Sequence, residues 1–173
     1  VVDRALVKST EAIIESDITA YPFQTETTVA DWHYKTGQRY MSSREAVELL
    51  MQNVSRNGTM LLNLTQHGRG DLDPQLTTIA KDIGLWLKVN GEAVYGSRPF
   101  ESYGDKEVLF TRNNGKVYAT ILKWNGGPIT MKALRSGGVT LGKVSSVEIL
   151  GDGQSVGFVQ NDQGLTVTPS GSF

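Results

Sequence analysis

The chain has 173 residues, a formal net charge of −1, and no cysteine. Near-neutral charge argues against binding to nucleic acid or anionic membranes through bulk charge, and the missing cysteines exclude disulfides and thiolate chemistry. No apolar run is long enough to span a membrane. The sequence does not determine the cellular compartment, although a secreted or periplasmic bacterial protein is favoured over a cytoplasmic one.

The N-terminal stretch, residues 1 to about 20, has a mixed pattern that predicts one or two helical turns with irregular flanks. The chain begins Val1-Val2-Asp3-Arg4, with neither an initiator methionine nor a signal-peptide pattern. We therefore expect it to start within a longer protein.

A helix is predicted from the capping box Ser42-Ser43-Arg44-Glu45, because apolar residues follow it at helical spacing. We expect Asn57-Gly58 to end this helix, with the glycine in the left-handed conformation. The apolar run 59–64 then predicts a strand buried on both faces. A second helix is expected from Asp73, as N-cap, and Pro74 to Asn90-Gly91, with one apolar face.

After Pro99 the pattern changes to short β-rich runs divided by turns such as Asn113-Asn114-Gly115, a hairpin signal. About six strands are expected in the last seventy residues, which suits a small antiparallel β-sandwich. The expected runs are 108–111, 117–124, 129–134, 144–150, 156–160 and 165–168. We predict two parts, residues 1–99 with α/β character and residues 100–173 all-β.

The segment Tyr21–Tyr34 combines two carboxylates, a histidine, several hydroxyls and four aromatic rings. A sugar site needs fixed donors and acceptors for hydroxyls, and an aromatic ring against the apolar face of the pyranose. A surface loop whose rings cover a core edge is the alternative. Asn63 and the loop 65–71 would lie on the same side, at the carboxyl end of the buried strand.

Four segments of the sequence are distinctive: Phe23-Gln24-Thr25-Glu26-Thr27, Asp31-Trp32-His33-Tyr34, residues 53–64 and, most specifically, Asn90-Gly91-Glu92-Ala93-Val94-Tyr95-Gly96-Ser97-Arg98-Pro99. Together they resemble the last third of a glycoside hydrolase family 29 α-L-fucosidase. The resemblance covers nearly the whole chain. It implies the C-terminal part of a (β/α)₈-like TIM barrel (residues 1–99) followed by a β-sandwich (residues 100–173), without a cofactor or metal.

The resemblance also implies retaining hydrolysis of terminal α-L-fucosides by two carboxyl groups about 5 Å apart. No motif here matches the family's nucleophile, which we expect outside this chain. Glu26 is the first candidate for the acid/base and Asp31 the second, with a structural carboxylate as the alternative for each. The partners implied are a fucosylated oligosaccharide or glycoconjugate and the remaining part of the barrel, or further copies of the chain.

For substrate binding, Trp32 matches a family tryptophan that contacts the methyl group and apolar face of fucose. Phe23, His33 and Asn63 are further candidates, with packing or turn hydrogen bonds as alternatives. His67, Arg69 and Asp71 are expected as solvated charges on the rim, and Glu92 as a structural residue. The competing hypothesis is a non-catalytic fragment or a carbohydrate-binding or structural module.

Overall fold

The structure, a computed structural model, describes residues 7–105, 107–137, 142–151 and 153–169. Contacts divide the chain into two compact units. The first comprises Val1–Tyr103 and Phe110–Tyr118, and the second Gly104–Leu109 and Ala119–Phe173. No helix among the described residues is long and apolar enough to cross a membrane.

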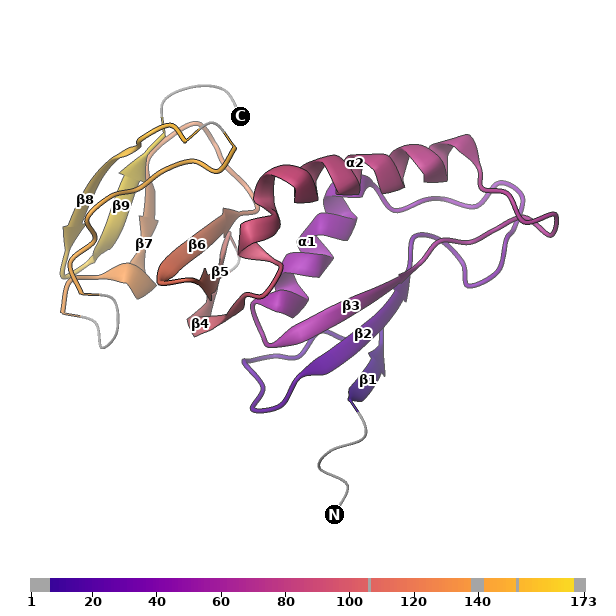
Figure 1. Cartoon of the computed structure of the whole chain (residues 1–173), viewed down its shortest axis with the longest axis horizontal. Helices are drawn as coiled ribbons and strands as arrows, with labels where there is room; N and C mark the ends of the chain where they lie inside the picture. Colours follow the sequence, from indigo (N-terminus) through magenta and orange to yellow (C-terminus); the bar gives the residue numbers. More distant parts are fainter. Residues whose placement is uncertain (1–6, 106, 138–141, 152, 170–173) are drawn as a thin grey trace, which may run out of the picture. The chain divides into compact units, whose positions relative to one another are not determined.

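The first unit is built on a parallel sheet in the order β1-β2-β3, formed by Lys8–Glu11, Phe23–Thr28 and Gly58–Asn63. Helix α1 (Ser43–Val54) connects β2 to β3, and α2 (Pro74–Asn90) follows β3 (Figure 1). This repeated strand–helix succession is the α/β pattern expected from the sequence.

Strand β1 replaces the helical turns predicted for the N-terminal stretch, of which residues 1–6 lie outside the described residues. Its four residues are Lys-Ser-Thr-Glu, mostly exposed. A short strand with polar residues on both sides has no apolar alternation, so nothing in the local pattern identified it. Pairing with β2 determines its conformation instead.

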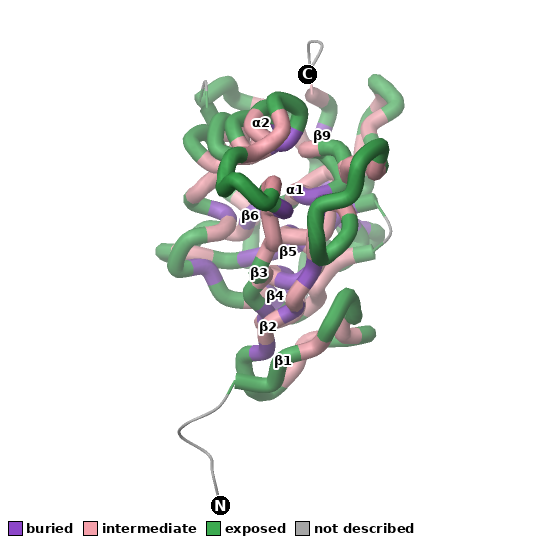
Figure 2. Tube along the Cα trace, turned by 90° about the vertical axis from the view of Figure 1, so that its right-hand side faces the viewer, coloured by how far each residue is buried: buried purple, intermediate pink, exposed green. Residues whose placement is uncertain are grey.

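Strand β2 alternates strictly, with Phe23, Thr25 and Thr27 buried and the residues between them half-buried (Figure 2). The buried side faces the helices, because the Thr25 hydroxyl donates to Asn53 Oδ1 of α1 at 2.6 Å. Asn53 is fully buried, and its amide also donates to the Leu49 carbonyl.

The predicted capping box of α1 is confirmed: the Glu45 N–H donates to Ser42 Oγ, and the Ser42 N–H donates to the Glu45 carboxylate. The role predicted for Gly58 is wrong. Asn57 adopts the left-handed conformation (φ 76°), and Gly58 is needed for space. A Cβ at Gly58 would lie 2.4 Å from Cζ of Phe23, so the ring occupies that volume.

Strand β3 was expected to be buried on both faces, and the structure corrects this. Its residue Leu61 is 46% exposed, whereas Leu62 packs against a core of Val29, Leu76 and Ile79. In the described part of the chain the two helices cover only one face of the sheet, so alternate side chains of β3 have different environments.

The β-rich residues form two three-stranded sheets. The strands are β4 (Arg98–Gly104), β5 (Val108–Asn113) and β6 (Lys116–Ile121), in that order, and β7 (Ile129–Met131), β8 (Gly157–Asn161) and β9 (Gly164–Thr168), in the antiparallel order β7-β9-β8. Short 3₁₀ turns, Gly91–Ala93 and Lys132–Leu134, follow α2 and β7.

The hairpin predicted at Asn114-Gly115 is confirmed, because both residues have positive φ (48° and 77°), as a type I′ turn requires. Several strand predictions differ. The second half of the run 129–134 is the 3₁₀ turn Lys132–Leu134 and not a strand. Residues 144–150 make only an isolated bridge, Glu148 with Ser155, so their alternation does not form a strand. Strand β4, by contrast, begins at Arg98-Pro99, where a boundary between parts was expected.

Candidate active site

The face of the parallel sheet that the helices leave uncovered carries two carboxylates side by side. Glu11 of β1 is the register partner of Glu26 of β2, which in turn is paired with Leu61 of β3. Register partners on neighbouring strands project from the same face. Both glutamates lie in the carboxyl-terminal halves of their strands, toward the end where α/β folds bind ligands.

Glu26, the first acid/base candidate, is half-buried, and its carboxylate accepts a hydrogen bond from the Ser9 hydroxyl at 2.6 Å. We expected Phe23 to contact the substrate. The strand alternation corrects this: Phe23 is three residues from Glu26, on the opposite face, and only 1% exposed. Its ring packs in the core beside Gly58.

Trp32 lies in the loop after β2 and is 42% exposed. Its indole N–H donates to Glu11 Oε1 at 2.9 Å, and its backbone carbonyl accepts from Asn63 Nδ2 at 3.3 Å. Sequence reasoning missed Glu11, because the strand that carries it was not recognised. The pairing of Lys8–Glu11 with β2 is what places Glu11 beside Glu26.

Asp31, the second candidate, is exposed, and its carboxylate lies 3.8 Å from Lys35 Nζ. Its backbone carbonyl accepts from the hydroxyls of Thr65 (2.6 Å) and Thr28 (3.1 Å). His33, two residues further on, is also exposed. The loop is thus held through its backbone, and the side chains of Asp31 and His33 remain accessible.

Asn63 ends β3 and contacts the loop after β2. Its amide donates to Thr28 Oγ1 and to the Trp32 carbonyl, both at 3.3 Å. Of the two roles considered for Asn63, the turn hydrogen bond is the one visible in the structure. Its contact with a ligand stays a prediction.

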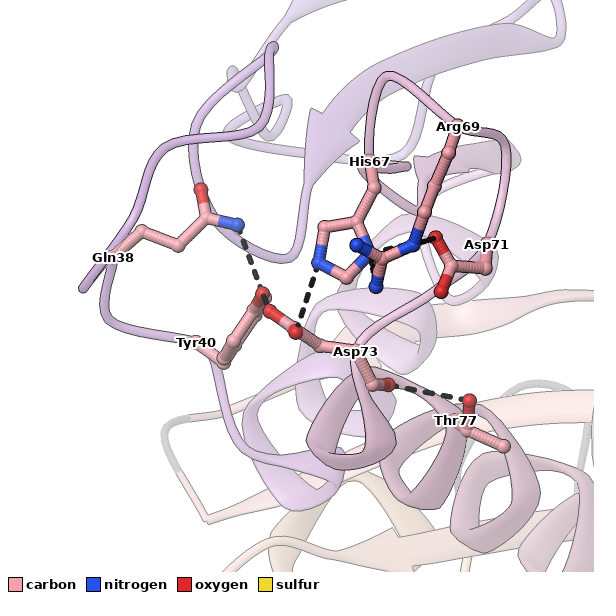
Figure 3. A network of polar contacts seen from close by, with 7 residues as sticks. All are labelled: Gln38, Tyr40, His67, Arg69, Asp71, Asp73 and Thr77. Atoms are coloured by element: carbon pink, nitrogen blue, oxygen red, sulfur yellow. Dashed lines mark hydrogen bonds and ion pairs between the residues drawn. The ribbon is translucent and has the colours of Figure 1, made fainter.

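A polar network joins the loop after β2 to the loop after β3 (Figure 3). His67 lies between two carboxylates, with Nδ1 2.8 Å from Asp71 and Nε2 3.0 Å from Asp73. The Tyr40 hydroxyl donates to Asp73, and the Tyr34 ring meets the His67 ring edge to face at 4.3 Å.

This network corrects the expectation of a solvated charge for His67 alone, whose side chain is only 12% exposed. The side chains of Arg69 and Asp71 are 73% and 50% exposed, as the expectation of solvated charges requires. Arg69 pairs with Asp71 at 2.7 Å, and its hydrogen bond, followed by that of His67, holds the pKa of Asp71 below its usual range. Burial, together with the hydrogen bond to Asp73, raises the pKa of Tyr40. Asp73 is the N-cap residue of α2 as predicted, but its carboxylate makes no capping bond.

A pocket of about 760 Å³ lies between the loop after β2 and α1. Its lining includes Asp31, Lys35 and Gln38 from the loop and Glu48 and Gln52 from the helix. Neither Glu26 nor Trp32 lines it. The pocket is therefore a neighbour of the carboxylate-bearing face and not the same site. No group of three or more potential metal ligands occurs among the described residues.

Solved structures of α-L-fucosidases share this fold. Isoenzyme 1 from Paenibacillus thiaminolyticus matches 95% of the chain at a TM-score of 0.83 and 24% identity, over 41% of its own length. A Bacteroides thetaiotaomicron GH29 enzyme, trapped as a covalent intermediate with 2-fluoro-fucosyl fluoride, matches 96% of the chain at a TM-score of 0.79 and 18% identity, over 40% of its own length.

Comparison at the level of sequence gives the same family. Residues 2–92 match the family model for α-L-fucosidase, so the chain belongs to the α-L-fucosidase family, glycoside hydrolase family 29. An α-L-fucosidase of Branchiostoma floridae is 31% identical over 128 residues, 72% of this chain, and the tissue α-L-fucosidase of Mus musculus is 32% identical over 130 residues, 71% of this chain. The chain spans 27% and 28% of the length of these two relatives.

Proposed function

We propose that the chain is part of an enzyme that hydrolyses terminal α-L-fucosides with retention of configuration. The observation that carries the proposal is the exposed polar face of the parallel sheet, where Glu26 lies beside β1 and Trp32 is joined to that strand by its indole N–H. Membership of the family supports the substrate class. Residues 1–99 are assigned to a (β/α)₈-like catalytic barrel and residues 100–173 to a β-sandwich.

Retention is supported by the Bacteroides relative, which was trapped as a covalent intermediate. A covalent glycosyl-enzyme belongs to the retaining mechanism, in which a nucleophile and an acid/base stand about 5 Å apart. We assign the nucleophile to a part of the protein outside this chain, either the remainder of the barrel or a further copy.

Glu26 is proposed as the acid/base. The Ser9 hydroxyl fixes one of its oxygens at 2.6 Å, which orients the carboxyl group toward the uncovered face. Such a group protonates the departing oxygen and then deprotonates the attacking water. Asp31 is the alternative, since its carboxylate is accessible in the loop after β2.

Trp32 is proposed to contact the apolar face and methyl group of fucose, with His33 and Asn63 near the hydroxyls. Its half-exposed ring offers the flat surface that a pyranose stacks on. Phe23 is left out of this role, because its ring has no exposed face.

The test is hydrolysis of nitrophenyl α-L-fucoside by the intact protein, with the anomer of the first product followed by NMR. Glu26→Gln should reduce kcat/KM for fucosides with poor leaving groups by about 10²–10⁴-fold, and much less for an activated aryl fucoside. Glu48→Gln, on the helix side of the sheet, is the matched control and should retain the full rate.

An unchanged rate for Glu26→Gln on the poor leaving group removes Glu26 from the acid role, and the same leaving-group pattern in Asp31→Asn transfers the role to Asp31. An inverted product contradicts retention. Fucose binding without hydrolysis by the intact protein would instead establish a carbohydrate-binding module.

A further inference from the structure

The sequence contains four Asn-Gly pairs, which begin at Asn57, Asn90, Asn114 and Asn125. Such a pair has a chemical property besides its turn conformation. The backbone nitrogen of the glycine can attack Cγ of the asparagine side chain, because a glycine has no side chain to obstruct the approach. Ammonia then leaves, a cyclic imide forms, and water opens the imide to aspartate or isoaspartate. The four pairs differ in how far the fold permits this attack.

Two of the pairs are held in arrangements that oppose it. The Asn57 side-chain amide donates to the Thr19 carbonyl at 3.0 Å, and Gly58 is buried at the start of β3. The Asn90 side-chain amide donates to the Trp86 carbonyl at 3.0 Å, in the last turn of α2. In both pairs the nitrogen that would depart is bound to a carbonyl outside the Asn-Gly turn, which opposes the rotation that the attack requires.

Asn125 is in a different situation. It is exposed, in the loop between β6 and β7, which belong to different sheets. Its Oδ1 accepts the backbone N–H of Gly127 at 3.1 Å, so the side chain folds over its own turn. Gly126, between them, has φ 86°, and a Cβ built on it would meet nothing within 4 Å. The hydrogen bond therefore closes a ring that contains both Cγ of Asn125 and the Gly126 nitrogen, in open surroundings.

The same hydrogen bond favours the chemistry. When the Gly126 nitrogen adds to Cγ of Asn125, the negative charge of the tetrahedral intermediate develops on Oδ1. The Gly127 N–H already donates to that oxygen. It is therefore placed to stabilise the charge as an oxyanion-hole donor does in acyl transfer.

Asn114 has the glycine but a more rigid backbone. A Cβ on Gly115 would also meet nothing within 4 Å. However, the pair forms the turn between the neighbouring strands β5 and β6, with φ of 48° and 77°. Both dihedral angles are those of a type I′ turn, so the attack has to distort a hairpin. We expect Asn114 to react more slowly than Asn125.

Asn161 has the hydrogen bond but lacks the glycine. Its Oδ1 accepts the Gln163 N–H at 2.9 Å, in the same relation as Asn125 to the residue two positions on. The residue between them is Asp162, whose side chain crowds the attacking nitrogen. Its negative charge also opposes removal of the proton from that nitrogen. Among these turns, Asn125 combines an unhindered nitrogen with a donor on Oδ1.

We propose that Asn125 is a site of spontaneous deamidation in the folded protein, with the Gly127 N–H assisting the attack by the Gly126 nitrogen. The Cγ–Nδ2 bond breaks, ammonia leaves, and water opens the imide, so the amide becomes a carboxylate. The aspartate product keeps an acceptor for Gly127. The isoaspartate product lengthens the loop backbone by a carbon atom and strains the bond of 2.7 Å from the Trp124 indole N–H to the Gly127 carbonyl. This inference does not depend on fucoside hydrolysis.

The test is a time course of the intact protein at mildly alkaline pH, where the attacking nitrogen loses its proton more readily. Peptides are mapped by mass spectrometry, which detects conversion of the amide to a carboxylate. Asn125 should be converted at least about 10-fold faster than Asn57 and Asn90, and about three-fold faster than Asn114. In guanidinium chloride most of this lead should disappear, because only the fold distinguishes the four pairs.

Two variants test loss and gain. Gly126→Ala places a Cβ beside the attacking nitrogen and should slow conversion of Asn125 at least about 10-fold. Asp162→Gly supplies the glycine that Asn161 lacks and should bring its rate to within about three-fold of that of Asn125.

Three results overturn the inference. The first is conversion of Asn114 in the folded protein as fast as that of Asn125, and the second is a lead of Asn125 that persists in guanidinium chloride. The third is an unreactive Asn161 in folded Asp162→Gly protein, because the N–H on Oδ1 would then give no assistance. An Asn125 that stays intact in the folded protein, while the unfolded protein reacts, has the same consequence.

Discussion

The two faces of the parallel sheet differ in almost every property. On the helix side, Phe23 and Thr25 of β2 are 1% and 2% exposed, and Thr25 is bonded to Asn53 of α1. On the other side, Ser9, Glu11 and Glu26 form an open polar surface with Trp32 attached to it. The same strand supplies both faces, because successive side chains point in opposite directions.

This difference separates the residues that specify the fold from those that are available for chemistry. A side chain on the helix side is constrained by volume, as the Gly58–Phe23 contact demonstrates. On the open side, Glu26 is held by a hydrogen bond from Ser9 and Glu11 by one from Trp32, so these side chains are less constrained by volume. Substitutions on the helix side should consequently lower the stability of the protein, whereas substitutions of polar residues on the open side should chiefly lower its activity.

The largest expected effect on stability comes from Phe23→Ala. Removing this buried ring leaves a cavity beside Gly58 and should reduce the free energy of unfolding by about 3–5 kcal/mol. Leu61→Ala is the matched substitution on the open face, where the side chain is 46% exposed. It should reduce the stability of this chain by less than about 1 kcal/mol. Urea denaturation of both variants measures the contrast, and equal losses would contradict the division between faces.

An intermediate effect is expected in the network that joins the loop after β2 to the loop after β3. His67→Ala removes the hydrogen bonds that His67 makes with Asp71 and Asp73 and should reduce the unfolding free energy by about 2 kcal/mol. Arg69→Ala is the control, because the Arg69 side chain is 73% exposed and its ion pair with Asp71 should contribute less than about 1 kcal/mol. A larger loss for Arg69 than for His67 would mean that the surface ion pair, and not the imidazole, holds the loops together.

The same network predicts a loss of stability at alkaline pH. The folded-state pKa of Tyr40 is raised above its usual value of 10.0 by burial and by the hydrogen bond to Asp73. A raised pKa adds stability that is fully present below the unfolded-state pKa and is lost as the pH rises through the folded-state value. Denaturation midpoints should therefore fall more steeply above about pH 10 in the parent than in Tyr40→Phe.

The sequence predicted the elements whose signals are local. The capping box identified α1, Asn114-Gly115 identified a hairpin, and Asp73-Pro74 identified the start of α2. Each of these depends on a hydrogen bond or dihedral angle within a few residues. The family resemblance, carried by longer motifs, was confirmed by the match over residues 2–92.

What the sequence left out depends on pairing between distant segments. The conformation of strand β1 is determined by its pairing with β2. Glu11 becomes a candidate site residue only through its register with Glu26 and its hydrogen bond from Trp32. Phe23 was placed in the sugar site from its neighbours in sequence, whereas strand alternation places it on the opposite face from Glu26. The roles of Glu26, Asp31, Trp32, His33 and Asn63 toward a ligand stay predictions.

The smallest expected effect concerns the N-terminus of α1, the helix that covers the buried face. Ser42→Ala removes the hydroxyl that accepts the Glu45 N–H at 3.2 Å and should destabilise the chain by about 1 kcal/mol. Ser43→Ala, one residue on, is the control and should cost only a few tenths, since its hydroxyl lies at 3.4 Å from Asp82. Ser42→Thr, which retains a hydroxyl, should restore most of the loss.

The capping box also gives this prediction a pH dependence. The Ser42 backbone N–H, followed by the Ser42 hydroxyl, lowers the pKa of Glu45 below its usual 4.5. A lowered carboxyl pKa adds stability that is present above the unfolded-state pKa and is lost as the pH falls through the folded-state value. The stability difference between the parent and Ser42→Ala should therefore narrow in acid, because the hydroxyl's bond to the Glu45 carboxylate weakens on protonation. If the stability curves of the parent and Ser42→Ala stay parallel as the pH falls through the folded-state pKa of Glu45, the Ser42 hydroxyl acts only by accepting the Glu45 backbone N–H. Its hydrogen bond to the Glu45 carboxylate would then contribute nothing.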